Sequence, residues 1–285
     1  MRLSLIFNPA AGRGRARRHA AEAADLLRGL GAQVDTAASA SPDDLTRLAA
    51  EGSRGGYDRV VVCGGDGTLH RAVRDFDLRT PLALLPLGSG DDFAKVCGLP
   101  RKLREACEVA VGGTIREVDV ARANGIRYMG VAGLGFDSEV AAFAGEVKFL
   151  RGSLIYLYAI LRVLPRFTPH RVRINGREQT IMFATVGNSR QYGGGIRITP
   201  AAEIDDGQLD TCIVHETSRF QLLKTLPLAY SGAHVKRPYV ETGRGREFRF
   251  ESERPLDVYA DGELVTTTPV TFDLAPEKLR FVVAR

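Results

Sequence analysis

The chain has 285 residues, of which 44% are hydrophobic and 26% are charged, and its formal net charge at pH 7 is +5. This length can hold one large domain or two of ordinary size, and the composition excludes an intrinsically disordered chain. The positive charge favours anionic partners such as nucleotides, acidic lipid surfaces or nucleic acid, without choosing among them.

The first half of the chain alternates short apolar strands with helical segments. Strands are predicted at residues 3–7, 32–36, 60–63 and 81–86. Helices are predicted at residues 16–30, from Pro42 with Ser41 as the N-cap, from Thr68 toward Phe76, and at 103–111. Continuous apolar strands separated by helices predict a doubly wound, mostly parallel α/β sheet, which binds its ligand at the carboxyl ends of the strands.

A glycine turn, Gly64-Gly65-Asp66-Gly67-Thr68, follows the third predicted strand. The three glycines are expected to allow positive φ angles and to bring backbone N–H groups close to a ligand, with Asp66 pointing into the same space. Because a helix begins here, its dipole favours an anion, and phosphate with magnesium fits both features. An ordinary tight turn is the alternative that these residues leave open.

A second glycine turn, Gly88-Ser89-Gly90, follows the fourth predicted strand and opens another helix. Two such turns at successive strand ends are expected to face one cleft. The pattern G-x-x-x-x-G-K-[ST] does not occur, and Phe93 stands where G-x-G-x-x-G needs its third glycine. The sequence therefore excludes a P-loop and a dinucleotide-binding fingerprint.

From Thr114 onward, β-rich runs are separated by hairpin turns at Asn124-Gly125, Asn175-Gly176 and Asp261-Gly262. Helices interrupt them at residues 137–148, 153–164 and 220–230. We therefore predict a doubly wound α/β domain at residues 1–122 and a second, mainly antiparallel domain at 123–285, packed around a shared cleft.

The helix predicted at 153–164 contains the longest apolar run of the chain, residues 154–161. This run is far short of the ~20 residues that cross a bilayer, so no membrane span is predicted. Tyr156, Tyr158 and the Leu and Ile residues around them are expected to lie in the core, with a membrane-contacting foot as the alternative. No export segment is found, and a cytoplasmic location is expected.

Six motifs, taken together and in this order, resemble the bacterial soluble diacylglycerol kinase family, which is related to sphingosine and ceramide kinases. They are Asn8-Pro9 with Gly12-Arg13, Gly64 to Thr68, Pro86 to Ala94, Val118-Asp119-Val120, Asp205 to Asp210, and Asp261-Gly262-Glu263. The resemblance covers nearly the whole chain. It implies a nucleotide-binding domain followed by a β-sandwich that receives a lipid.

The resemblance also implies roles on the nucleotide side, where the two glycine turns bind ATP and Asp66 acts through water on its Mg²⁺. The nucleotide-side positions are Asn8, Arg13, Gly64, Gly65, Asp66, Gly67, Thr68, Gly88, Ser89, Gly90, Asp92 and Lys95. The charges that line the cleft in relatives match Arg13, Asp92, Lys95, Asp119 and Glu263, with Arg162 as a further candidate.

On the acceptor side, the resemblance implies that Asp261 is the base toward the lipid hydroxyl, with Glu263 also among the catalytic candidates. A plain type I′ turn is the alternative for Asp261. A structural magnesium is implied at Asp206, together with the carbonyls of Glu203 and Gln208.

One residue departs from the family pattern, because Asp91 stands where the family usually has Asn. An additional carboxylate near nucleotide phosphates is expected to weaken binding unless a cation or a hydrogen bond compensates for it.

The sequence therefore predicts an ATP-dependent lipid kinase that transfers the γ-phosphate to the hydroxyl of diacylglycerol or a similar lipid, in transient contact with the inner membrane surface. A ceramide or sphingoid-base kinase stays open, as does a nucleotide- or lipid-binding sensor without turnover. NAD kinases share Gly-Gly-Asp-Gly-Thr, but their later signatures are not found. No nucleic-acid partner is expected, and a homodimer is left open. The mechanism requires the carboxylates of Asp66 and Asp261 to face each other across a gap.

Overall fold

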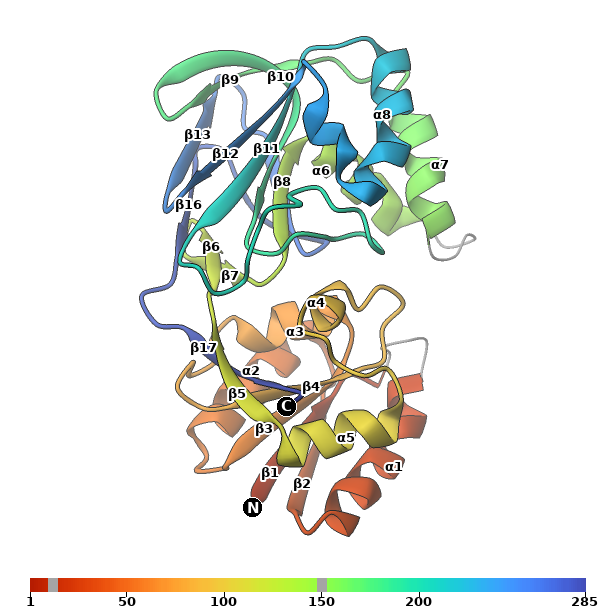
Figure 1. Ribbon diagram of the computed structural model, residues 1–285, viewed down its shortest axis with the longest axis vertical. Coiled ribbons are helices and arrows are strands. Elements are labelled where there is room, and N and C mark those ends of the chain that lie inside the picture. Colours follow the sequence, from red (N-terminus) through yellow and green to blue (C-terminus); the bar gives the residue numbers. More distant parts are fainter. Residues whose placement is uncertain (10–14, 148–152) are drawn as a thin grey trace. The chain divides into compact units, whose positions relative to one another are not determined.

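The computed structural model describes residues 1–9, 15–147 and 153–285, which form two compact units (Figure 1). The first unit comprises residues 1–120 and 276–285, and the second comprises residues 121–275. The chain thus leaves the first unit close to the predicted boundary at residue 122, and it returns to that unit for its last ten residues.

The first unit is a six-stranded sheet with the strand order β2-β1-β3-β4-β17-β5. In that order, the strands are Gln33–Ala38, Arg2–Phe7, Arg59–Gly64, Leu82–Pro86, Leu279–Val283 and Thr114–Val118. Strands β2, β1, β3, β4 and β17 run parallel, and β5 is antiparallel to β17. The predicted mostly parallel sheet is confirmed.

Helices cover both faces of this sheet. They are α1 (Arg15–Gly29), α2 (Pro42–Arg54), α3 (Asp66–Val73), α4 (Asp92–Val96) and α5 (Leu103–Gly112). Helices α1 and α5 pack with alternate strand residues such as Leu5 and Val61, whereas α2 lies on the opposite face against Ile6 and Val60. The predicted start of α2 is confirmed, because the Ser41 hydroxyl accepts the Asp44 N–H at 3.1 Å.

The last ten residues belong to the first unit, whereas the sequence-based division assigned them to the second domain. Strand β17 pairs with β4 and β5, and Leu279, Phe281 and Val282 are fully buried. Apolar alternation in this segment predicts a strand, but it carries no information on which sheet the strand joins.

The second unit is an eleven-stranded sheet whose main path runs β15-β14-β8-β10-β9-β13-β16-β6-β7, with β11 on β10 and β12 on β11. Its pairings are antiparallel, as predicted. From β6 to β16, the strands are Ala121–Ala123, Ile126–Tyr128, Val131–Gly135, His170–Ile174, Arg177–Gly187, Leu209–His215, Val240–Gly245, Phe248–Ser252, Asp257–Ala260, Glu263–Thr267 and Val270–Leu274.

The three predicted hairpin turns of the second unit are confirmed by their backbone angles. In Asn124-Gly125, Asn175-Gly176 and Asp261-Gly262 both residues have positive φ, between 48° and 86°. This is the requirement of a type I′ turn, which matches the twist of the paired strands.

The helices of the second unit are α6 (Phe136–Glu146), α7 (Ser153–Val163) and α8 (Arg219–Ser231), followed by the 3₁₀ turn Ala233–Lys236. They pack on a core cluster that includes Phe136, Ala159 and Leu222. The expectation that the apolar residues of α7 all lie in the core is wrong, because Tyr156, Leu157 and Leu161 are exposed. Among the described residues, no helix combines the length and hydropathy needed to span a bilayer.

Candidate functional site

The two predicted glycine turns lie side by side at the carboxyl edge of the first sheet. β1, β3 and β4 are adjacent, with Phe7 in register with Cys63 and Gly64 in register with Pro86. Asn8 and both turns follow directly from these strand ends. The Leu87 N–H also donates to the Gly64 carbonyl at 3.0 Å, which joins the turns through the backbone.

Glycine is required in these turns by close packing. A Cβ built on Gly65 would lie 2.8 Å from the Cα of Gly88, and one built on Gly88 would lie 2.7 Å from the Cα of Gly65. A Cβ on Gly64 would collide with the Thr68 side chain. The expected positive φ angles are not found at Gly64, Gly65 or Gly67, so that prediction is wrong. Gly65 and Gly88 are therefore required by the contact between the two turns, and Gly64 is required by its contact with Thr68.

Gly67 differs from its neighbours, because a Cβ placed on it would have no heavy atom within 4 Å. Its backbone lies in the first turn of α3, and the N-cap residue Gly65 has no side chain with which to cap that turn. The N–H groups of a helix N-terminus bind phosphate readily. The arrangement therefore leaves room for an anionic ligand close to the Gly67 backbone.

Asp66 has a structural partner that the sequence did not reveal. Its Oδ2 accepts the N–H of Asp92 and its Oδ1 accepts the N–H of Phe93, both at 3.0 Å. The carboxylate thus caps α4 and ties the two turns together. Because a carboxylate oxygen can accept more than one hydrogen bond, Asp66 can still accept one from a metal-bound water.

Asp91 is buried and adopts a left-handed backbone conformation, with φ of 52°. Its Oδ1 accepts the N–H of Gly88 at 2.8 Å. Asp and Asn are the side chains that tolerate this conformation best, so Asp91 can perform the backbone role expected of Asn. A hydrogen bond of the kind expected to compensate for the additional carboxylate is thus present on Oδ1, and the effect of Asp91 on nucleotide binding stays a prediction.

The other nucleotide-side candidates lie around these turns. Asp92 is buried, and its Oδ1 is 3.1 Å from Nζ of the exposed Lys95. Thr68 is buried, Asn8 and Gly90 are half-buried, and Ser89 is exposed. Arg13 lies outside the described residues.

In the second unit, the Asp261 side chain is held by three backbone donors. Its Oδ2 accepts the N–H of Met129 at 2.9 Å, and its Oδ1 accepts those of Gly130 at 2.9 Å and Val131 at 3.2 Å. A Cβ on Gly130 would lie 2.5 Å from Oδ1, so glycine is needed there. These contacts fix the orientation of the carboxylate, and the half-buried Glu263 begins the next strand.

Asp206 lies in the turn where a structural magnesium is implied. Its Oδ1 accepts the Gln208 N–H at 3.0 Å, and its Oδ2 is 3.4 Å from Arg244 Nη1. Arg244 also pairs with Asp210, whose carboxyl pKa is raised by burial although the guanidinium opposes the shift. Within the described ranges, no group of three or more His, Cys, Asp or Glu side chains could hold a metal. Magnesium held by Asp206 and the carbonyls of Glu203 and Gln208 stays a prediction.

Comparisons with known proteins decide the family. A model described as the diacylglycerol kinase catalytic domain matches residues 2–123, and one described as the YegS C-terminal NAD kinase beta sandwich-like domain matches residues 130–283. The chain belongs to the diacylglycerol kinase family. A relative named diacylglycerol kinase from Mycobacterium tuberculosis is 33% identical over 100% of this chain and 96% of its own, and one from Bacillus subtilis is 25% identical over 95% and 92%.

Solved structures agree on the fold of this diacylglycerol kinase family member. A crystal structure titled as a diacylglycerol kinase from Bacillus anthracis has a TM-score of 0.80 at 24% identity, covering 99% of this chain and 96% of that one. An NAD kinase from Archaeoglobus fulgidus has a TM-score of 0.52 at 14% identity, covering 99% and 93%. The resemblance drawn from six motifs is therefore confirmed, while the residue roles that it implied stay predictions.

The candidate cleft charges of this family member are partly neutralised within their own units. Asp119 is buried and lies 3.0 Å from Nζ of Lys278, which precedes β17. Arg162 is exposed in the last turn of α7. Asp66 belongs to the first unit and Asp261 to the second. That these two carboxylates face each other stays a prediction.

Sequence reasoning missed a polar pair in the second unit. Asp137, at the start of α6, accepts a hydrogen bond from the Tyr192 hydroxyl. Burial raises the pKa of the Asp137 carboxyl to about 6, and the bond to Tyr192 works in the opposite direction. The two residues are 55 positions apart, so no local spacing could have revealed the pair.

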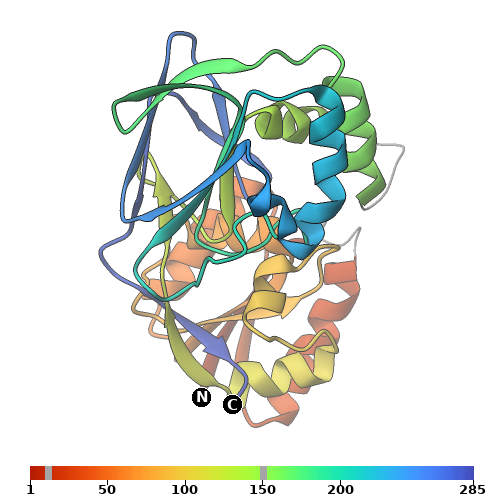
Figure 2. The same ribbon diagram turned by 45° about the horizontal axis from the view of Figure 1, so that its top comes forward.

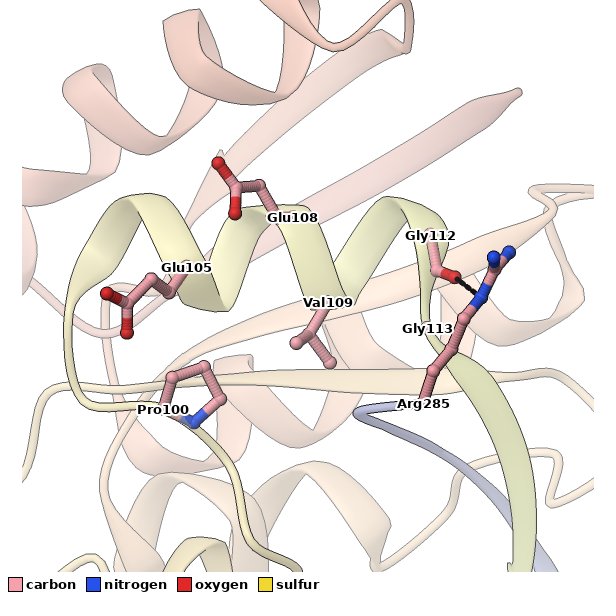
Figure 3. A pocket seen from close by; sticks show the side chains of 7 residues that line it. All are labelled: Pro100, Glu105, Glu108, Val109, Gly112, Gly113 and Arg285. Atoms are coloured by element: carbon pink, nitrogen blue, oxygen red, sulfur yellow. Dashed lines mark hydrogen bonds between the residues drawn. The ribbon is translucent and has the colours of Figure 1, made fainter.

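A hollow in the first unit lies along α5 (Figure 3). It is lined by Pro100, Glu105, Glu108, Val109, Gly112, Gly113 and Arg285. Arg285 Nε donates to the Gly112 carbonyl at 3.0 Å. Because no residue of either glycine turn lines this hollow, it is not part of the candidate site.

Proposed function

We propose that the chain transfers the γ-phosphate of ATP to the hydroxyl of diacylglycerol or a similar lipid. The observation that carries this proposal is the packing of the two glycine turns. Gly65 and Gly88 are in backbone contact, while Gly67, at the start of α3, has open space beside it. The turns lie within the region that matches the diacylglycerol kinase catalytic domain.

Phosphoryl transfer requires little covalent chemistry from the protein. It requires that the phosphates are held in position and that the negative charge of the transition state is neutralised. In our proposal, the first-turn N–H groups of α3 bind phosphate oxygens, and the Lys95 ammonium adds positive charge. Mg²⁺, when bound, would neutralise part of the negative charge of the β- and γ-phosphates. It usually keeps several waters and takes only one or two carboxylates, which fits Asp66 with its oxygens already accepting backbone N–H groups.

On the acceptor side, we assign Asp261 as the general base. Its carboxylate takes the proton of the lipid hydroxyl as the hydroxyl oxygen bonds to the γ-phosphorus and the bond to ADP breaks. Three backbone donors orient the carboxylate before substrate arrives, which supports this role. Glu263, which begins β15 directly after this turn, is a second candidate to contact the acceptor.

The lipid class is tested by labelled phosphate transfer. Purified protein is incubated with γ-labelled ATP, Mg²⁺ and a panel of diacylglycerol, monoacylglycerol, ceramide and sphingosine, and products are separated by thin-layer chromatography. We expect labelled phosphatidic acid. Label only on a sphingoid base or ceramide would overturn the diacylglycerol assignment, and Mg²⁺-dependent ATP binding without transfer to any lipid would favour a sensor without turnover.

A further inference from the structure

The second unit exposes an unusual concentration of large apolar side chains. In the described part of the chain, nine large hydrophobic residues are exposed, and five of them lie on α7 and α8. We call these five residues the α7–α8 apolar face: Tyr156, Leu157, Leu161, Phe220 and Tyr230. Leu161 is 53% exposed and Phe220 is 65% exposed, so these side chains are largely in contact with water.

The two helices share a core on their inner sides. Ala159 of α7 and Leu222 of α8 belong to one buried cluster, which Leu164 joins just after α7. Arg219, the first residue of α8, donates to the carbonyl of Phe167 at 3.2 Å. Figures 1 and 2 both show α7 and α8 alongside each other in the second unit. The exposed residues therefore occupy the outer sides of two neighbouring helices.

Helices α7 and α8 and the chain segments that flank them carry no acidic residue, and the exposed acidic residues of α6, which packs against α7, are Glu139 and Glu146. The chain has 34 acidic residues, yet none occurs from Ser153 to Arg177 or from Thr217 to Val240. The exposed basic residues of these segments on and beside the two helices are Arg162, Arg166, Arg219, Lys224, Lys236 and Arg237. Nζ of Lys224 lies 4.3 Å from the centre of the Phe220 ring. Aromatic and Leu side chains together with Lys and Arg are typical of helices that lie in a membrane interface.

A protein partner fits this composition less well. The core of a protein interface is depleted in Lys, whereas here Lys224 lies against the Phe220 ring within the apolar face. An anionic phospholipid surface satisfies both features, because its headgroups attract the basic side chains and its acyl boundary accepts the apolar ones.

We propose that the α7–α8 apolar face docks on an anionic phospholipid bilayer. Leu157, Leu161 and Phe220 enter the boundary between headgroups and acyl chains, and Lys224 with the neighbouring arginines contacts lipid phosphates. This inference rests on the proposed lipid kinase function, because the docked bilayer would be the surface from which the enzyme takes its lipid acceptor. The binding itself does not depend on phosphate transfer.

Vesicle sedimentation tests the proposal with the full chain. Vesicles of phosphatidylcholine alone are compared with vesicles of equal parts phosphatidylcholine and phosphatidylglycerol. We expect wild-type protein to partition at least about tenfold more strongly onto the anionic vesicles and to be weakened by added salt. Leu161→Ser, Phe220→Ser and Lys224→Glu should each weaken this partitioning about tenfold.

Two matched controls keep the comparison specific. Leu264→Ser changes a residue as exposed as Leu161 but on β15, and Arg246→Glu makes the same change of charge as Lys224→Glu in the β12–β13 turn. We expect both controls to bind within about twofold of wild type. Since all five substitutions are at exposed positions, thermal unfolding should confirm that each variant is folded.

Three outcomes would overturn the proposal. These are wild-type protein that does not bind anionic vesicles, face variants that bind like wild type, and controls that weaken binding as much as the face variants. If light scattering shows a dimer that the face variants break while their vesicle binding is unchanged, the face instead binds a second copy of the chain.

The same variants separate this inference from the proposed function. With water-soluble dioctanoylglycerol as acceptor, the face variants should keep wild-type activity, and they should lose it on anionic vesicles. Vesicle binding that behaves as described, without transfer to any lipid, would leave the docking surface standing and remove the proposed function.

Discussion

The Asp66 carboxylate joins the two glycine turns through the α4 amides, so its removal affects folding as well as chemistry. We expect Asp66→Ala to lower the free energy of unfolding by about 1–2 kcal/mol, the usual effect of losing a helix cap. Lipid phosphorylation should fall by at least about 100-fold, since the proposed hydrogen bond from Asp66 to a metal-bound water would also be lost. Urea unfolding and initial rates measure the two effects.

Ser41→Ala is the matched control for that variant, because the Ser41 hydroxyl caps α2, a helix that contains neither glycine turn. It should lose about 1 kcal/mol of stability and keep its activity. If Asp66→Ala is destabilised to the same extent as Ser41→Ala yet remains active, Asp66 is only a structural cap.

Asp137 gives the protein a pH-dependent stability. Its folded carboxyl has a pKa of about 6 against an ordinary value of 3.8. Between these values the folded chain holds a proton that the unfolded chain has released, so stability falls as pH rises from about 4 to 6 and this contribution is then constant. The stability of Asp137→Asn relative to wild type should therefore rise by about 2 kcal/mol between pH 4.5 and pH 7. Urea titrations at both pH values measure this, and a pH-independent difference would contradict the assignment.

Two glycines of the first turn allow the effect of packing on stability to be measured apart from the effect of ligand contact on ATP binding. Gly67→Ala meets no neighbour and lies in a helix, so it should fold as well as wild type or gain up to about 1 kcal/mol. If phosphate approaches this backbone, the same variant should raise the KM for ATP at least about tenfold. Gly65→Ala should instead be destabilised by more than 1 kcal/mol, since its Cβ meets Gly88.

Calorimetric titration of Gly67→Ala with ATP and Mg²⁺ tests whether the phosphates of ATP approach the Gly67 backbone. Wild-type affinity in a stable Gly67→Ala protein would show that no ligand approaches this part of the turn.

The elements themselves were largely predictable because their signals are local. Ser41 before Pro42 marks the start of a helix, and Asn175-Gly176 marks a hairpin, each through its own backbone chemistry. Contacts between elements were not predictable in this way. Asp66 caps α4 through residues that are 26 and 27 positions further along the chain, and the spacing of residues within a helix cannot predict such a contact.

For the whole molecule, the first unit depends on the end of the chain. Phe281 in β17 is fully buried and packs edge-on against Phe93 of α4, with ring centroids 5.4 Å apart. We expect Phe281→Ala to lower the free energy of unfolding by about 3–5 kcal/mol and to weaken ATP binding, because α4 carries Asp92 and Lys95.

Phe250→Ala is the control, since Phe250 is fully buried in the second unit. Phe250→Ala should lower the free energy of unfolding about as much as Phe281→Ala does, but the folded Phe250→Ala protein should still bind ATP. A Phe281→Ala protein that unfolds at the wild-type urea midpoint would contradict the assignment of β17 to the first sheet.

Two domains were predictable because the pattern of the sequence changes near Thr114, from apolar strands that alternate with helices to β-rich runs separated by hairpin turns. The return of residues 276–285 to the first unit was not predictable, because the sequence of a five-residue strand does not indicate which sheet the strand joins.

In the proposed reaction, Asp261 accepts the proton of a lipid hydroxyl and the first unit binds ATP. The most direct measurement compares transfer from γ-labelled ATP to diacylglycerol by wild type and Asp261→Asn, with ATP affinity and stability measured on the same samples. We predict that Asp261→Asn binds ATP like wild type but forms labelled phosphatidic acid at least about 100-fold more slowly. A folded Asp261→Asn protein that labels the lipid at the wild-type rate would contradict the claim.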